Sequence, residues 1–207
     1  MQTPIVPAKG KEESKQRLLN AVGEILESQG YAALKINHVA KVAGRDKALI
    51  YKYFGGLDGL LEEYIHRLDF WSNVPSDVAA HHLTDHGQSL AIRMLQEQFD
   101  YVFKHRELQK VLLWRLSEER PSLRKLKVNQ EAKGEALLGN ITDPHFGGQA
   151  KRFRAVMAIL ISGIDYLNLY ASANGSVFCG LDLKDQENRE SIQDALDFLV
   201  TATYDNL

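Results

Sequence analysis

The chain has 207 residues, of which 44% are hydrophobic and 25% charged, and its formal net charge at pH 7 is −2. This length suits one domain or a small domain joined to a larger one, with enough apolar residues to bury a core. The single cysteine, Cys179, excludes an intramolecular disulfide and a cysteine-rich metal site.

The charge is unevenly distributed along the chain. Residues 1–60 contain nine Lys or Arg and six Asp or Glu, a net charge of +3, so the remainder carries −5. The N-terminal part is therefore the part expected to approach phosphate. Residues 1–11 lack the apolar segment of a signal peptide. The apolar run 155–169 is interrupted by polar residues and falls short of the roughly 18 residues of a membrane span. We expect a cytoplasmic protein with no membrane partner.

Helical periodicity dominates the N-terminal part. Residues 1–11 are expected to form a disordered arm. Gly44 permits a tight turn between two short helices, and Asp46 suits the N-cap of the second, where a side-chain oxygen accepts backbone N–H groups. The helices expected here, with approximate ends, are 11–29, 36–43, 47–54 and 57–73.

The rest of the chain continues with helical patterns and no predicted strand. The expected helices span approximately 90–104, 107–119, 121–140, 149–173 and 185–204. Residues 143–148 contain one proline and two glycines and are expected to form a loop. The pattern predicts an all-α protein of about nine helices. Its expected parts are a three-helix helix-turn-helix domain over 12–56, a connecting helix over 57–73, and a C-terminal helical bundle over 74–207.

The segment 39–61 carries the strongest functional signal. Two short helices meeting at a glycine are typical of a helix-turn-helix, whose second helix lies in the DNA major groove. Ile50 and Phe54 are four residues apart and are expected to pack inward. The outward side is then basic and aromatic, and consists of Lys47, Ala48, Leu49, Tyr51, Lys52 and Tyr53.

Those outward residue types suit DNA. Lysines and tyrosine hydroxyls contact phosphates, Lys47 can reach guanine acceptors, and small apolar side chains can touch thymine methyls. The alternative is that Lys47 and Lys52 are ordinary solvated lysines and that Tyr51 is a core residue.

The Ala43-Gly44 turn and the Tyr51-x-x-Phe54 helix resemble the N-terminal domain of the tetracycline-repressor (TetR) family over about residues 12–64. The resemblance implies a bacterial, ligand-responsive transcriptional repressor that binds an inverted-repeat operator in double-stranded DNA as a homodimer. It implies no cofactor and no enzymatic activity. It also adds four DNA-facing positions to those named above: Lys35, Asn37, His38 and Arg45.

Three positions depart from the family pattern. Lys35 replaces the Thr or Ser that caps the second helix, and Arg45 replaces a Val in the turn. Leu57 replaces a Lys that would contact phosphate at the start of the fourth helix, which weakens the expectation of strong DNA binding. Free N–H groups at the start of that helix can partly substitute for the lost contact.

By resemblance, the C-terminal part forms the dimer interface. The last two predicted helices carry wide apolar faces that suit a four-helix interface between two subunits. The alternative is that these faces are buried within one subunit. The expected interface residues are Val156, Ile159, Leu160, Gly163, Leu167, Tyr170, Ile192, Ala195, Leu196, Leu199 and Thr203.

By the same resemblance, this part encloses a pocket for a small apolar or amphipathic ligand. Asp165 stands among apolar neighbours and needs a partner, either a cationic ligand or an arginine of the second subunit. The alternative for each aromatic or Met residue is an ordinary place in the core. The expected lining residues are Met94, Gln98, Phe99, Tyr101, Phe103, Trp114, Met157, Asp165 and Tyr166.

Other function classes have weaker support. His81, His82 and His86 form the only metal-like group, and we expect no metal there because no cysteine is nearby. No nucleophile or phosphate-binding glycine pattern indicates catalysis. Two alternatives stay open: a helical interaction protein with a degenerate DNA-binding head, motivated by Leu57, and a small-molecule enzyme on a helical scaffold.

Overall fold

A computed structural model describes residues 8–73, 84–173 and 175–207. The N-terminal head comprises α1 (Ala8–Gln29), α2 (Ile36–Ala43), α3 (Ala48–Phe54) and α4 (Leu57–Leu68), with a 3-10 turn at Tyr31–Ala33. Its core is built from residues at helical spacing on α1, such as Leu18, Val22 and Ile25, which are fully buried against α2 and α4. Apolar burial at this spacing fixes which side of each helix faces outward.

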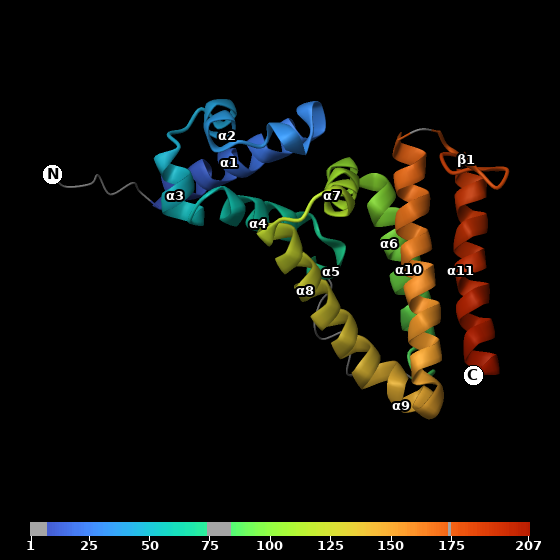
Figure 1. Cartoon of the computed structure of the whole chain (residues 1–207). Helices are drawn as coiled ribbons and strands as arrows, with labels where there is room; N and C mark the ends of the chain where they lie inside the picture. Colours follow the sequence, from blue (N-terminus) through green and yellow to red (C-terminus); the bar gives the residue numbers. More distant parts are fainter. Residues whose placement is uncertain (1–7, 74–83, 174) are drawn as a thin grey trace.

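The body contains longer helices. They are α6 (Gln88–Lys104), α7 (Arg106–Ser117), α8 (Pro121–Leu137), α10 (Ala150–Ala173) and α11 (Gln186–Asn206). In Figure 1, α10 and α11 stand side by side at the end of the molecule farthest from the head, and α8 runs obliquely between the two ends. Among the described residues, nine α-helices have seven residues or more, in agreement with the predicted all-α class.

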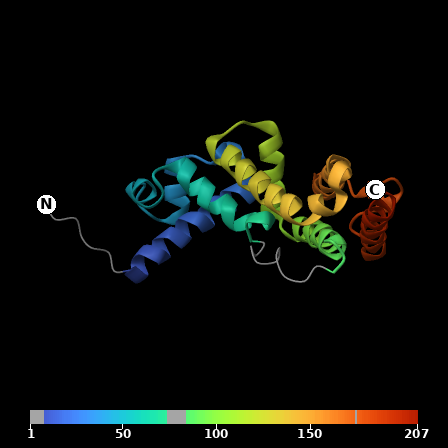
Figure 2. The same ribbon diagram turned by 90° about the horizontal axis from the view of Figure 1, so that it is seen from below.

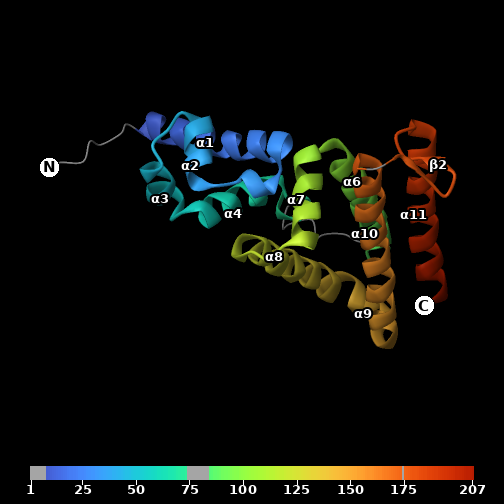
Figure 3. The same cartoon turned by 45° about the horizontal axis from the view of Figure 1, so that its top comes forward.

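Two large hydrophobic clusters hold these elements together. One joins the head to Val111 and Trp114 of α7 and to Leu123 and Leu126 of α8. The other lies between α6, α10 and α11, around the fully buried Phe99, Phe153 and Val200. Figure 3 shows α7 and α8 lying between α4 and the two terminal helices. The head core therefore continues into the body instead of ending at a linker.

The first helix begins earlier than the sequence predicted. α1 starts at Ala8, so residues 8–11 are helical and not part of an arm, while residues 1–7 lie outside the described residues. Glu12–Lys15 and Glu13–Arg17 form ion pairs three and four residues apart, a spacing that favours the first turns of the helix.

The predicted connecting helix over 57–73 is interrupted. α4 ends at Leu68, and a separate single turn, α5 (Phe70–Asn73), follows. Asp69 between them is buried, and its carboxylate accepts a 2.5 Å hydrogen bond from Gln130 Nε2 of α8. Tyr101 Oη of α6 donates a 3.1 Å bond to the Leu68 carbonyl. These tertiary bonds satisfy polar groups at the end of α4 and stabilise the break.

Residues 143–148 are also more ordered than predicted. A π-helical turn, Leu138–Thr142, leads into α9 (Asp143–Phe146) and a 3-10 turn, Gly147–Gln149. Pro144 lies in the first turn of α9, where its missing N–H costs nothing. The predicted loop is therefore a tight helical corner between α8 and α10.

The absence of strands was predicted wrongly. β1 (Val177–Phe178) and β2 (Leu181–Asp182) pair antiparallel between α10 and α11. The turn residues Cys179 and Gly180 both have positive φ, 51° and 80°, as in the two-residue turns that favour tight hairpins. Strands of two residues carry no alternating pattern that a sequence analysis can detect.

The membrane expectation also needs qualification. The helical stretch 121–173 includes a window that is long and apolar enough to cross a membrane by length and composition, and one third of that window (33%) is buried within the chain. Core helices pass the same test. The predicted histidine group is only partly described, since His81 and His82 lie outside the described residues. Among the described residues, no group of three or more His, Cys, Asp or Glu side chains could hold a metal ion.

Candidate nucleic-acid interface

Two glycines in the left-handed conformation delimit α3. Gly44, with φ 60° and ψ 40°, ends α2, and Gly55, with φ 75°, ends α3. Asp46 Oδ1 accepts a 2.7 Å hydrogen bond from the Ala48 N–H, so the predicted capping residue does bond at the start of the helix. α3 is therefore a seven-residue helix that is capped by Asp46 at its start and ended by Gly55.

The faces of α3 differ sharply in exposure. Ile50 is fully buried in the head core, and Phe54 packs against the same core. Tyr51 is 58% exposed, which rules out the alternative that it is a core residue. The remaining exposed residues of the predicted outward side are Lys47, Ala48 and Lys52, whereas Leu49 and Tyr53 are half-buried against the head core.

α3 lies at one end of the molecule. Figure 1 shows α3 at the opposite end from α11, and Figure 2 shows the same separation from below. A terminal position of this kind is the one that a helix needs in order to enter a groove about 12 Å wide.

The predicted residues on α2 differ among themselves. Lys35 and Asn37 are exposed at the start of α2, and Lys35 makes no capping bond, as the sequence predicted. His38 is half-buried, with Nδ1 3.1 Å from the Ala33 carbonyl oxygen. That contact orients the His38 ring through Nδ1, and the second ring nitrogen is Nε2.

Arg45 is held by the head itself. Its Nε donates to Ser14 Oγ at 3.2 Å, and its Nη2 lies 3.2 Å from Glu13 Oε1, both on α1. The side chain is only 24% exposed. The sequence placed Arg45 toward DNA, whereas in the structure it ties the turn to the first helix, a pairing across more than thirty residues that spacing alone does not reveal.

Lys11 was missed by the sequence analysis. Its Nζ lies 6.0 Å from the centre of the Tyr53 ring, the same distance as Lys52 Nζ. The first turns of α1 thus add a third lysine beside α3. The start of α4 is different, because Leu57 is half-buried against the head core. The position where the family pattern has a lysine therefore contributes to packing.

The predicted pocket residues are distributed over separate clusters. Phe99 and Met157 lie in the cluster between α6, α10 and α11, Trp114 in the head cluster, and Tyr101 in a smaller one with Val102 and Leu108. Of the others, Met94 and Gln98 are buried on α6, Phe103 stacks on the Arg189 guanidinium at 3.8 Å, and Tyr166 is 54% exposed.

Asp165 finds its partners within the same chain. Gln98 Nε2 donates to Asp165 Oδ1 at 3.1 Å, and Arg115 Nη2 lies 3.9 Å from Oδ2. Burial raises the pKa of Asp165, while the Gln98 bond and Arg115 act in the opposite direction. Arg115 also donates to Gln130 Oε1 at 2.8 Å, and Gln130 bonds Asp69. This polar chain joins α6, α10, α7 and α8 to the break after α4.

The predicted interface residues fall into two groups. Leu160 and Leu196 are buried in their own subunit, and Val156, Leu167 and Ile192 pack partly against the same cluster. Tyr170 and Thr203 are half-buried. The exposed members are Ile159, Gly163, Ala195 and Leu199. Phe198, which is 69% exposed on α11, was missed because the helical spacing used did not include it.

An exposed, basic and aromatic α3 after a glycine turn, carried by an all-α body, defines a regulator of the helix-turn-helix class. Residues 18–64 match the family described as bacterial regulatory proteins, tetR family. The match covers α2, α3 and most of α4 and so identifies the head as the DNA-binding domain of this family, which supports a TetR family transcription regulator.

Comparison of the whole structure supports the same fold. A TetR family transcription regulator from Marinobacter aquaeolei VT8 has a TM-score of 0.61 at 16% identity, over 90% of this chain and 97% of that chain. The proposed transcriptional regulator SCO7518 from Streptomyces coelicolor A3(2) has a TM-score of 0.54 at 17% identity, over 91% and 99%. Identities this low establish the fold alone. No curated protein matches the sequence.

Proposed function

We propose that this protein is a ligand-responsive repressor that binds a palindromic operator as a homodimer, with α3 of each subunit in the major groove. The observation that carries the proposal is the exposure of Lys47, Tyr51 and Lys52 on a short helix capped at both ends. Exposed lysines release counterions from DNA, and a Tyr hydroxyl can bond a phosphate. We further propose roles for Lys35, Asn37 and Lys11 in backbone contacts.

The test is the salt dependence of operator binding. The operator is first located by footprinting, and a gel shift then compares wild type with the double variant Lys47→Ala/Lys52→Ala. Each lost phosphate contact lowers the slope of log K against log salt by about 0.9, so two lysines in two subunits predict a fall of about 3.6. Lys127→Ala, an exposed lysine on α8, is the control. An unchanged slope in the double variant contradicts the proposal.

The homodimer is proposed from the exposed apolar side of the last two helices. Ile159 is 72% exposed and Tyr166 54% on α10, while Phe198 is 69% and Leu199 43% exposed on α11. Large apolar side chains concentrated on one pair of helices are typical of a subunit interface. Phe198→Glu is expected to convert a dimer to a monomer in sedimentation velocity. Val128→Glu, at a 60% exposed apolar position on α8, is expected to leave the dimer intact.

An amphipathic effector is proposed to act on the polar chain that runs from Gln98 to Asp69. Gln98 is 3% exposed, and its Oε1 has no hydrogen-bond partner in the described part of the chain. A hydrogen-bond donor on a ligand would satisfy that oxygen. The polar chain from Gln98 to Asp69 would then transmit the effect of the ligand to the end of α4. A thermal-shift screen is the test. The proposal requires a compound that raises the melting temperature of wild type but not of Gln98→Leu, and that weakens operator binding.

A further inference from the structure

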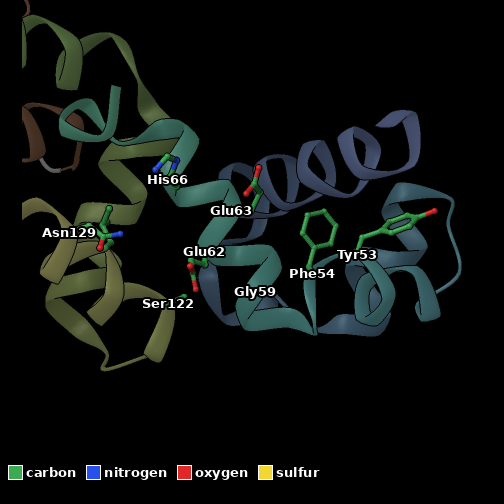
Figure 4. A pocket seen from close by; sticks show the side chains of 9 residues that line it. Tyr53, Phe54, Gly59, Glu62, Glu63, His66, Ser122 and Asn129 are labelled. Carbon is green, nitrogen blue, oxygen red and sulfur yellow. The ribbon is translucent and has the colours of Figure 1, made fainter. Parts of the chain in front are cut away.

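A groove of about 400 Å³ lies where the head meets α8. Its walls come from three elements: Tyr53 and Phe54 at the end of α3, Glu62 and Glu63 on α4, and Ser122 and Asn129 on α8. Figure 4 shows that α4 crosses the middle of this region, with the aromatic side chains toward one end and Asn129 toward the other. The groove is separate from the polar chain around Asp165, which shares none of its lining residues.

The lining of the groove is acidic. Among the described residues, the lining includes two glutamates and one histidine but no lysine or arginine. Glu62 pairs with Lys125 and Glu63 with Arg67, and the side chains of both pairs are between 39% and 59% exposed. Exposed ion pairs of this kind contribute little to stability, so an entering cation can displace Lys125 from Glu62 or Arg67 from Glu63 at low cost.

Ser122 supplies an independent indication of a ligand. It is 2% exposed at the second position of α8, and its Oγ has no hydrogen-bond partner in the described part of the chain. A buried hydroxyl without a partner is unfavourable unless another group completes its bonding. Ser122 is one of the residues that line the groove, so a hydrogen-bond donor bound there that reaches the hydroxyl would provide the missing partner.

The remaining wall suits an aromatic group. The Tyr53 and Phe54 rings lie 6.5 Å apart, nearly perpendicular at 80°, and Leu126 adds an apolar surface from α8. Aromatic rings at such angles accept another ring at an edge or a face. The groove therefore combines negative charge, a free buried acceptor and an aromatic wall within one small volume.

We propose that this groove binds a small protonated aromatic amine, with its ammonium near Glu62 and Glu63, an N–H donated to Ser122 Oγ, and its ring against Phe54. Such a ligand contacts the DNA-reading helix, α4 and the body together, so it would fix the orientation of the head. The effect on operator binding rests on the proposed function, whereas occupancy of the groove does not.

Calorimetric titration of the full-length protein with tryptamine tests the site without DNA. Ser122→Ala is expected to weaken tryptamine binding about tenfold, because one hydrogen bond is lost. The variant should unfold at the same temperature as wild type or higher, because the hydroxyl has no partner without ligand. Asn129→Trp should obstruct the groove and abolish binding, whereas Lys127→Trp, on α8 but outside the groove, should leave it unchanged.

N-acetyltryptamine, which keeps the indole but lacks the charge, is expected to bind at least tenfold more weakly than tryptamine. The proposal is overturned if wild type does not bind tryptamine, if both compounds bind equally, or if Ser122→Ala and Asn129→Trp bind tryptamine as wild type does. Failure of the ligand-free wild type to bind operator DNA in a gel shift, with tryptamine binding intact, would instead count against the proposed function.

Discussion

Tyr64 links the head to the body through one buried bond, and Tyr64→Phe tests its strength. The Tyr64 hydroxyl on α4 donates a 2.5 Å hydrogen bond to Glu107 Oε2 on α7. Gly23 of α1 makes room for the pair, because a Cβ there would lie 2.9 Å from the hydroxyl and 3.0 Å from Glu107 Oε1. Hydrogen bonds to charged groups contribute about 1.5–3 kcal/mol. Glu107 is half-buried and can recruit water, so we expect a loss of about 1.5–2 kcal/mol.

Urea denaturation followed by circular dichroism measures this loss, and the melting temperature should fall by about 3–8 °C for a chain of this size. Tyr51→Phe, at a 58% exposed position, is the matched control in the absence of DNA and should change little. A Tyr64→Phe variant as stable as wild type within about 0.5 kcal/mol would refute a stabilising role for this bond.

The same bond predicts a pH dependence. Burial, followed by the Glu107 bond and charge, raises the pKa of Tyr64, and burial raises the pKa of Tyr204 to about 12. Since both folded-state pKa values are raised, the contribution of the two protonated tyrosines to folding stability is fully present below the unfolded-state pKa of about 10. That contribution is lost as pH rises above this value. Wild-type stability should fall above about pH 10, and less steeply in Tyr64→Phe.

Four further substitutions test the packing. Gly59→Ala should destabilise by about 1–3 kcal/mol, since its Cβ would lie 1.8 Å from the Phe54 carbonyl oxygen. Gly134→Ala, whose Cβ meets nothing within 4 Å, should stabilise by about 0.5–1 kcal/mol. If urea titrations give changes in unfolding free energy of the same sign for the two glycine variants, this difference is contradicted. Asp165→Asn should stabilise at pH 7 by about 1 kcal/mol, because burial disfavours the ionised form. The stability difference between wild type and Asp165→Asn should shrink as pH falls through the raised pKa of Asp165. Melting temperatures measured between about pH 7 and 4 test this. Arg189→Met should cost about 3 kcal/mol, because it removes a 95% buried guanidinium that pairs with Asp100 and stacks on the Phe99 and Phe103 rings. A melting temperature close to that of wild type would show that this guanidinium does not stabilise the fold.

Sequence reasoning succeeded where local chemistry determines the structure. The bounds of α2 agree with the prediction because Gly44 alone ends the helix, and the faces of α3 follow from the four-residue spacing of Ile50 and Phe54. The exposed Tyr51 follows from the same spacing.

It failed where the structure depends on contacts between distant residues. The break after α4 depends on Asp69 and Gln130, which are 61 residues apart, and the pairing of Arg45 with Glu13 spans 32. The hairpin at Cys179 was missed because four strand residues have no detectable period. For the candidate site, the sequence identified the α3 surface but not the groove beside it, since the partner wall on α8 is supplied by tertiary packing.

The hairpin turn has a practical consequence for following this protein in solution. Cys179 is the sole thiol of the chain, is exposed, and sits at the tip of the turn that joins the two terminal helices. A maleimide spin label attached there needs no engineered residue and perturbs neither the head nor the cores. Double electron–electron resonance between labels on paired copies would then report the spacing of the two hairpins, with and without DNA.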